Sequence, residues 1–175
     1  MTETLSNVKD SKIVKKNKFI TFFLDNEEYA VEIQKVREII GIMDITPIPN
    51  IPDYIKGVLN LRGKVIPVID LRLKFGMESK EYGDRTSIIV MEIDINNRRS
   101  SIGTVVDMVS EVLQISDEDF EETPSFGVDV NTNFIQGMAK VKGKVKILLD
   151  IEKVLTADDL GVLGNIDKVD ESQTV

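Results

Sequence analysis

The feature that most limits how this chain can fold is an internal duplication. Residues 54–75 (YIKGVLNLRGKVIPVIDLRLKF) align without gaps on residues 134–155 (FIQGMAKVKGKVKILLDIEKVL), at an offset of 80. Six of the 22 aligned positions are identical, whereas average residue usage gives about one or two. Residues 36–40 align with 109–113 at an offset of 73, and apolar runs at 19–24 and 88–93 begin each copy. The chain is therefore interpreted as two related units, about 19–84 and 85–155.

Each unit has the pattern of short β-strands. Residues 57–61 and 65–69 flank Gly63, and the second copy repeats this pattern around Gly143, so each segment is predicted to be a hairpin with a glycine at positive φ. Asp70 and Asp150 follow these hairpins, and each is predicted to cap a short helix. The proline-rich segment 47–52 is predicted to be a loop. We therefore expect a mainly β protein made of small barrels with short helices.

The two ends of the chain differ in composition from the middle. Residues 1–18 are polar with a cluster of lysines, and 165–175 are mostly polar and charged, so both are predicted to be mobile tails. Thr156, with Asp159 three residues later, is predicted to cap a short C-terminal helix over 156–166. The sequence thus predicts one folded region at 19–164.

Composition excludes several functional classes. The chain has 22 basic and 30 acidic residues, and its net charge of −8 disfavours binding to nucleic acid or anionic lipid. No apolar run is long enough for a membrane span or a secretory signal. There are no cysteines and no histidines, which removes disulfides, thiolate nucleophiles, cysteine-bound zinc and the usual general base. We expect a cytoplasmic protein without catalytic activity, cofactor or metal, and without direct insertion into the membrane.

Carboxylates are the remaining candidates for chemistry. A hydrolase using Asp70 and Asp150 would need the two groups about 5–10 Å apart in one cleft. The duplication instead puts them at equivalent positions of separate units, which favours helix capping. The acidic run 117–122 lacks the spacing of a calcium loop and is predicted to be a solvated turn.

Folding alone does not explain a small set of residues around Val36, Glu38 and Arg62. Arg62 stands directly before the turn glycine in a stretch of apolar strand residues, and the second copy carries Lys142 there. A surface arginine at a hairpin is ordinary, but a pairing of Arg62 with Glu38 is a second interpretation of the same residues.

Five stretches in the first copy carry a family resemblance: Glu28–Ile33, Lys35–Ile39, Tyr54–Val58, Asn60–Gly63 and Val65–Arg72. They resemble the characteristic sequences of CheW-type chemotaxis coupling proteins, and the resemblance extends from about Phe19 to Leu163. The combination of Asn-Leu-Arg-Gly with the following Pro-Val-Ile-Asp-Leu is its most specific part.

The resemblance implies a fold and a function. The fold is two five-stranded SH3-like β-barrels arising from the duplication. The function is that of a non-catalytic adaptor in bacterial chemotaxis signal transduction, which couples the cytoplasmic tips of chemoreceptors (methyl-accepting chemotaxis proteins) to the regulatory domain of a CheA-type histidine kinase. Such a protein is expected to be a monomer when free, and to be recruited to receptor arrays at the inner face of the membrane.

The resemblance also implies two sets of site residues. Val36, Ile39 and Val58 correspond to an apolar receptor-binding groove between the barrels, with Glu38 and Arg62 as an acidic–basic pair beside it. The kinase-binding positions implied are Lys56, Gly57 and Phe126. The sequence departs from the family pattern at Ser125, where an acidic residue often precedes the aromatic one.

A second hypothesis is a detached regulatory domain of such a kinase, which is itself similar to CheW. The lack of a histidine and of a nucleotide-binding segment favours a free-standing adaptor. Gene neighbourhood distinguishes the two hypotheses, because a coupling protein is expected near separate receptor and kinase genes.

Overall fold

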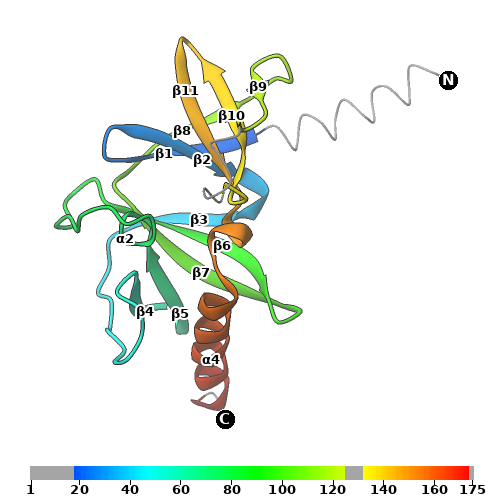
Figure 1. Ribbon diagram of the computed structural model, residues 1–175. Helices are drawn as coiled ribbons and strands as arrows, with labels where there is room; N and C mark the ends of the chain where they lie inside the picture. The colour runs from blue at the N-terminus through cyan, green and yellow to red at the C-terminus, as the bar shows by residue number, and fades with distance from the viewer. Residues whose placement is uncertain (1–17, 125–131, 174–175) are drawn as a thin grey trace.

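The structure, a computed structural model, describes residues 18–124 and 132–173, the side chains of 167–173 excepted. The described chain forms two β-sheets, which lie one above the other in Figure 1. The strands are β1 (Lys18–Leu24), β2 (Glu27–Glu32), β3 (Val36–Gly41), β4 (Ile55–Leu61), β5 (Lys64–Asp70), β6 (Ser87–Ile95), β7 (Arg98–Val106), β8 (Met108–Gln114), β9 (Phe120–Glu121), β10 (Ile135–Val141) and β11 (Lys144–Leu149). The helices are the 3₁₀ turn η1 (Ile33–Lys35), α2 (Leu71–Lys74), α3 (Ile151–Val154) and α4 (Ala157–Gln173).

The five-stranded sheet, with the order β3-β6-β7-β5-β4, closes on itself. The chain that leaves β3 pairs with β4, because the Thr46 amide donates to the Val58 carbonyl (2.8 Å) and the Val58 amide donates back (2.9 Å). Since β3 and β4 are the two edges of the sheet, this bridge joins them. We call this closed sheet barrel B.

The six-stranded sheet, barrel A, has the order β8-β1-β2-β11-β10-β9. The short strand β9 follows β8 in the chain and pairs with β10, and so it closes this sheet as Thr46 closes barrel B. Barrel A thus has one strand more than the five that the sequence predicted. The mainly β fold of two SH3-like units with short helices is otherwise confirmed.

The two sequence copies exchange strands. By the duplication, β1 and β2 correspond to β6 and β7, β3 corresponds to β8, and the hairpin β4–β5 corresponds to β10–β11. Barrel A contains β1 and β2 of the first copy with β8, β9, β10 and β11 of the second. Barrel B contains β3, β4 and β5 of the first copy with β6 and β7 of the second. The copy boundary near residue 84 therefore lies inside barrel B, between β5 and β6, and does not separate the barrels.

Three apolar clusters follow from this arrangement. The largest fills the space between the barrels, because its residues lie on the outer faces of both sheets; it includes Phe22, Val31, Ile69, Ile89, Met91 and Leu149. Leu59, Ile66, Val68, Ile88, Val90 and Val105 fill barrel B. Phe19, Ala30, Ile115, Ala139 and Leu148 fill barrel A.

The predicted hairpins and caps are confirmed. Gly63 (φ 87°) and Gly143 (φ 77°) both have positive φ, and so do the residues before them, Arg62 and Lys142 (both φ 52°). Two consecutive positive φ values are typical of the type I′ turns that join twisted antiparallel strands. Asp70 accepts hydrogen bonds from the Arg72 and Leu73 amides at the start of α2, and Asp150 caps α3 in the same way.

The C-terminal helix is longer than the sequence predicted. Thr156 and Asp159 form the expected capping box, in which each side chain accepts from the other residue's amide (3.0 and 3.1 Å). Helix α4 then extends to Gln173, into the segment 165–175 for which a tail was expected. No helix in the described part of the chain is both long and apolar enough to cross a bilayer.

Candidate functional site

Strand β3 carries most of the predicted groove residues, and a β-bulge decides which way they face. Val36 pairs with Met91 and Glu38 with Val90, so an extra residue is inserted between them. Directly paired residues lie on the same face of a sheet. Val36 and Ile39 therefore share the face of Met91 and Ile89, which is the face of the inter-barrel core, whereas Glu38 lies on the inner face of barrel B with Val90.

The end of β3 leaves apolar side chains uncovered at the margin of the inter-barrel core. Val36 packs against that core, while Ile39 is 42% exposed. Ile42 and Met43, directly after the strand, are 37% and 41% exposed. The sequence analysis missed Ile42 and Met43, although the signal was present as apolar residues that continue past a strand end towards the proline loop.

The predicted pair of Glu38 and Arg62 forms. The Arg62 guanidinium donates to the Glu38 carboxylate and so joins the β4–β5 turn to the edge strand β3. This hydrogen bond from Arg62 lowers the pKa of Glu38, and the same bond raises the pKa of Arg62. The pair lies in a surface hollow of about 210 Å³ that Arg37 and Lys64 also line. Glu38 is therefore a carboxylate held ionised in a basic surrounding.

The predicted positions in β4 have unequal surroundings. Val58 is half-buried and points to the outer face of barrel B, opposite Pro67. Lys56 is half-buried on the same strand. Gly57, at φ 134°, is buried under the Thr46 carbonyl, where a Cβ atom would overlap the backbone. The structure thus gives Gly57 a role in folding that does not depend on any partner.

Barrel A has an apolar counterpart of the β3 surface. At the offset of 73, Val36 and Ile39 correspond to Val109 and Val112 in β8. Val109 packs against the inter-barrel core, as Val36 does. Val112 is 55% exposed, and its equivalent Ile39 is 42% exposed. Each barrel therefore presents an edge strand with a covered and an uncovered apolar residue beside the shared core.

The alternative of an acid/base pair is not supported by the contacts of the two aspartates. One oxygen of Asp70 accepts from the amides of α2 and the other from the Tyr82 hydroxyl (2.7 Å). Asp150 accepts from the Glu152 amide of α3 (3.2 Å). Each carboxylate is engaged at the start of its own helix, as capping predicts.

Comparison with known proteins agrees with this architecture. The family model of the CheW-like domain matches residues 18–159. This chain belongs to the CheW-like family. A chemotaxis protein CheW from Klebsiella aerogenes is 41% identical over 150 residues, which cover 86% of this chain and 88% of that protein. The chemotaxis protein CheW of Rhizobium meliloti is 34% identical over 140 residues, covering 80% and 88% of the two chains.

A solved CheW structure also matches. The crystal structure of the scaffolding protein TtCheW from Thermoanaerobacter tengcongensis superimposes with a TM-score of 0.70 at 33% identity, covering 82% of this chain and 90% of that one. The family and the fold expected from the resemblance are thereby confirmed. Phe126, the remaining predicted kinase contact of the CheW-like domain, lies outside the described residues.

Proposed function

We propose that this CheW-like protein is a non-catalytic adaptor that couples the cytoplasmic tips of chemoreceptors to the regulatory domain of a CheA-type histidine kinase. Its relatives are named as chemotaxis and scaffolding proteins, which supports a role in that pathway. The adaptor works in the cytoplasm and is recruited to receptor arrays by the receptors that it binds.

The observation that carries the proposal is the row of uncovered apolar side chains at the end of β3. Ile39, Ile42 and Met43 are each more than a third exposed, and Ile39 lies on the face of the sheet that borders the inter-barrel core. An apolar surface of this kind accepts one face of an amphipathic helix, the form in which receptor tips present themselves. Val36 and Val58 are half-buried and are proposed to belong to the same surface. Burial of a few such residues carries most of the affinity of an interface.

The pair of Glu38 and Arg62 orients this surface. Both side chains are in contact with solvent, with 25% and 68% of their side-chain area exposed, and such a pair adds little to stability. Its contribution is geometric, because it holds the β4–β5 turn against the strand that carries Ile39. Loss of Arg62 is therefore expected to weaken partner binding while leaving the fold intact.

The kinase is proposed to bind at Lys56 and Gly57 of β4 and at Phe126. Lys56 provides a positive charge on β4, and Phe126 provides an aromatic side chain beside Ser125. The adaptor makes and breaks no covalent bonds. It transmits the receptor state because both partners contact one rigid body, so that a shift in one contact changes the population of kinase states at the other.

Titration calorimetry with two separate ligands tests this function. The ligands are a receptor signalling tip and a kinase regulatory domain. The substitution Ile39→Asp puts a charge on the apolar surface and is expected to weaken receptor binding by at least about tenfold, or about 1.4 kcal/mol, with kinase binding unchanged. Arg62→Ala is expected to weaken receptor binding to a smaller extent, and Phe126→Ala to weaken kinase binding alone.

Val145→Asp provides the matched control. Val145 is 49% exposed but lies at the far end of the β10–β11 hairpin, away from β3. The Val145→Asp variant is expected to bind both partners with the affinity of the wild type. An unmodified protein that binds neither ligand would overturn the proposed function, and equal affinities for the wild type and Ile39→Asp would overturn the assignment of the surface.

A further inference from the structure

Connections between strands carry the described chain from one barrel to the other at two points. It leaves barrel A after β2, through η1, and enters barrel B at β3. It returns between β7, the last strand of barrel B, and β8, the first strand of the second copy in barrel A. Asp107 is the single residue between those two strands. We call these the first and the second crossover.

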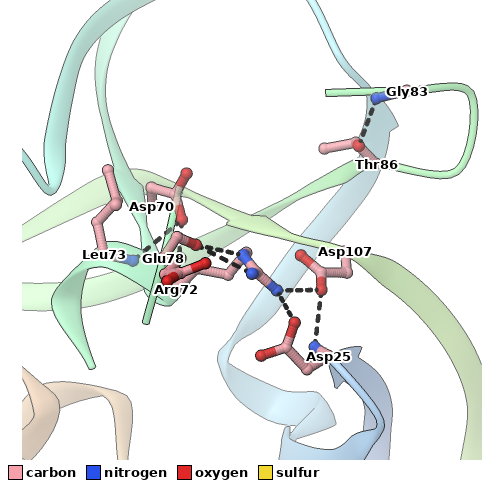
Figure 2. Close-up of polar contacts among 8 residues, drawn as sticks. All are labelled: Asp25, Asp70, Arg72, Leu73, Glu78, Gly83, Thr86 and Asp107. Atoms are coloured by element: carbon pink, nitrogen blue, oxygen red, sulfur yellow. Dashed lines mark hydrogen bonds and ion pairs between the residues drawn. The ribbon is translucent and has the colours of Figure 1, made fainter. Parts of the chain in front are cut away.

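The second crossover is held by the buried side chain of Arg72 (Figure 2). Arg72 belongs to α2, which follows β5 of barrel B, and its side chain is only 8% exposed. Its Nη1 donates to Asp107 at the crossover (2.8 Å) and to Asp25 in the β1–β2 turn of barrel A (2.5 Å). Its Nε and Nη2 donate to the Glu78 carbonyl (3.1 and 2.9 Å). One guanidinium thus binds groups of both barrels.

Asp107 completes this contact from the other side. Its carboxylate accepts from the Asp25 amide (2.7 Å), and its own amide donates to the Phe23 carbonyl (3.1 Å). Asp25 has a positive φ of 55°, a backbone conformation that the two contacts to its amide and carboxylate help to hold. The turn of barrel A is in this way fastened to the residue at which the chain changes barrel.

The first crossover is held by a similar contact with the charges reversed. Lys35, the last residue of η1, donates to Glu152 of α3 (2.9 Å), and both side chains are 36% exposed. Glu152 corresponds to Arg72 in the duplication, because 152 − 72 is the offset of 80 that relates the two copies. The same position of the repeat therefore contacts the crossover in both copies, as a cation in the first and as an anion in the second.

The crossovers also begin the strands that carry the uncovered apolar residues. Val36 follows Lys35 directly, and Val109 lies two residues after Asp107. Both pack against the inter-barrel core. Ile39 and Val112 each lie three residues further along the same strands. A shift of either crossover would displace the first residues of β3 or β8 against that core.

We propose that Arg72 and Glu152 are positioning residues that hold the two crossovers and so set the spacing between β3 and β8 on which receptor binding depends. This inference rests on the proposed adaptor function. The partly exposed pair of Lys35 and Glu152 adds little to stability by itself. The same position of the repeat nevertheless contacts both crossovers, with the charges reversed, which supports a positioning role. The receptor helix is then accepted by two edge strands whose separation is fixed before it arrives.

Distance measurement between the barrels tests the positioning directly. The chain has no cysteine, so the double variant Lys64→Cys/Lys144→Cys takes two spin labels, one on an exposed hairpin residue of each barrel. Glu152→Gln and, separately, Arg72→Lys are expected to broaden or shift the distance distribution. Arg99→Gln is the matched control, because Arg99 pairs with Glu92 within barrel B (3.0 Å) and is expected to leave the distribution unchanged.

Receptor-tip affinity is measured on the unlabelled proteins. Glu152→Gln and Lys35→Met are each expected to weaken binding about tenfold, and the double variant is expected to be no weaker than either single variant, because one contact is lost in all three. Glu152 is partly exposed and its variant is expected to fold, so the test does not depend on the buried Arg72.

The outcomes separate this inference from the proposed function. If the wild type binds no receptor tip, the adaptor function fails, while the distance distributions still decide whether the crossovers are held. If the wild type binds and Glu152→Gln shows the same distances and affinity, the positioning role is overturned. Additive losses in the double variant would equally overturn it, since the two residues would then act independently.

Discussion

At Gly57, the backbone geometry requires a glycine for a reason that the sequence motif alone does not reveal. The family resemblance placed it at a kinase contact, but the Thr46 carbonyl lies directly over its Cα, where the chain closes barrel B. Its repeat equivalent, Gly137, is covered in the same way by the Phe120 ring of β9, which closes barrel A. A glycine at this position of each copy lets the closing segment approach the hairpin.

The substitution Gly57→Ala is expected to destabilise the protein by at least about 2 kcal/mol, because it adds both a steric overlap and an unfavourable φ. Thermal or urea unfolding measures the change. Gly41→Ala is the control, since a Cβ atom at Gly41 meets nothing within 4 Å and its φ is not positive. Equal stabilities of the two variants would show that the segment around Thr46 moves aside at little cost.

At the scale of elements, a buried carboxylate fastens the C-terminal helix to barrel B. Asp159 of α4 is 1% exposed and accepts from Lys74 of α2 (2.6 Å) and from the Tyr54 hydroxyl before β4. The Lys74 ammonium also lies 4.4 Å from the centre of the Tyr54 ring. Burial and the bond to Asp159 together raise the pKa of Tyr54 to about 12.

Burial opposes the ionisation of Asp159, but the hydrogen bonds from Lys74 and Tyr54 outweigh it and leave its pKa below the usual range. A carboxyl whose folded pKa is lowered contributes stability above its unfolded pKa, and this contribution is lost as the pH falls through the folded pKa. Asp159→Asn is therefore expected to lower the free energy of unfolding by about 3–5 kcal/mol at pH 7, the cost of breaking a buried pair.

The difference between wild type and Asp159→Asn is expected to shrink below about pH 4, which chemical unfolding across the pH range measures. Amide exchange of α4 is expected to rise in the variant, because the helix loses its fastening. The neighbouring Asp158 is exposed, so Asp158→Asn provides the control. A pH-independent difference would indicate that the lost hydrogen bonds, and not the charge, account for the effect.

At the scale of the whole molecule, the exchange of strands makes the two sequence copies mutually dependent. The pairs β1–β8, β2–β11, β3–β6 and β5–β7 all join one copy to the other. A single copy would leave the partner edges of its strands unpaired and would lack half of the inter-barrel core. The folded unit is therefore the duplicated chain.

Separate fragments 18–84 and 85–173 are accordingly expected to be unfolded when alone and to regain β structure when mixed in equal amounts. Circular dichroism and the dispersion of amide resonances measure both states. Fragments cut elsewhere, at 18–53 and 54–173, serve as the comparison, because that cut falls in the loop before β4 and separates no complete copies. A stable fold of 18–84 alone would contradict the exchange as a requirement for folding.

Local sequence determined the strands, the hairpin turns and the caps of this protein. Alternating apolar residues, a glycine at a positive-φ turn and an aspartate before a helix each act over a few residues, so they can be read along the chain. The duplication predicted two related β units in the same way, and with the family resemblance it pointed to Glu38 beside Arg62 and to the apolar residues of β3.

Only the tertiary structure decided which strands pair and what the shared surface consists of. The exchange of β1–β2 with β6–β7 depends on contacts between residues far apart in sequence, and either arrangement would satisfy the same local pattern. The contact of Arg72 with Asp107 and the contact of Lys35 with Glu152 have the same origin. The exposure of Ile42 and Met43, which directly follow β3, could likewise be read only from the packed molecule, because burial is a property of the packed molecule and not of the residue.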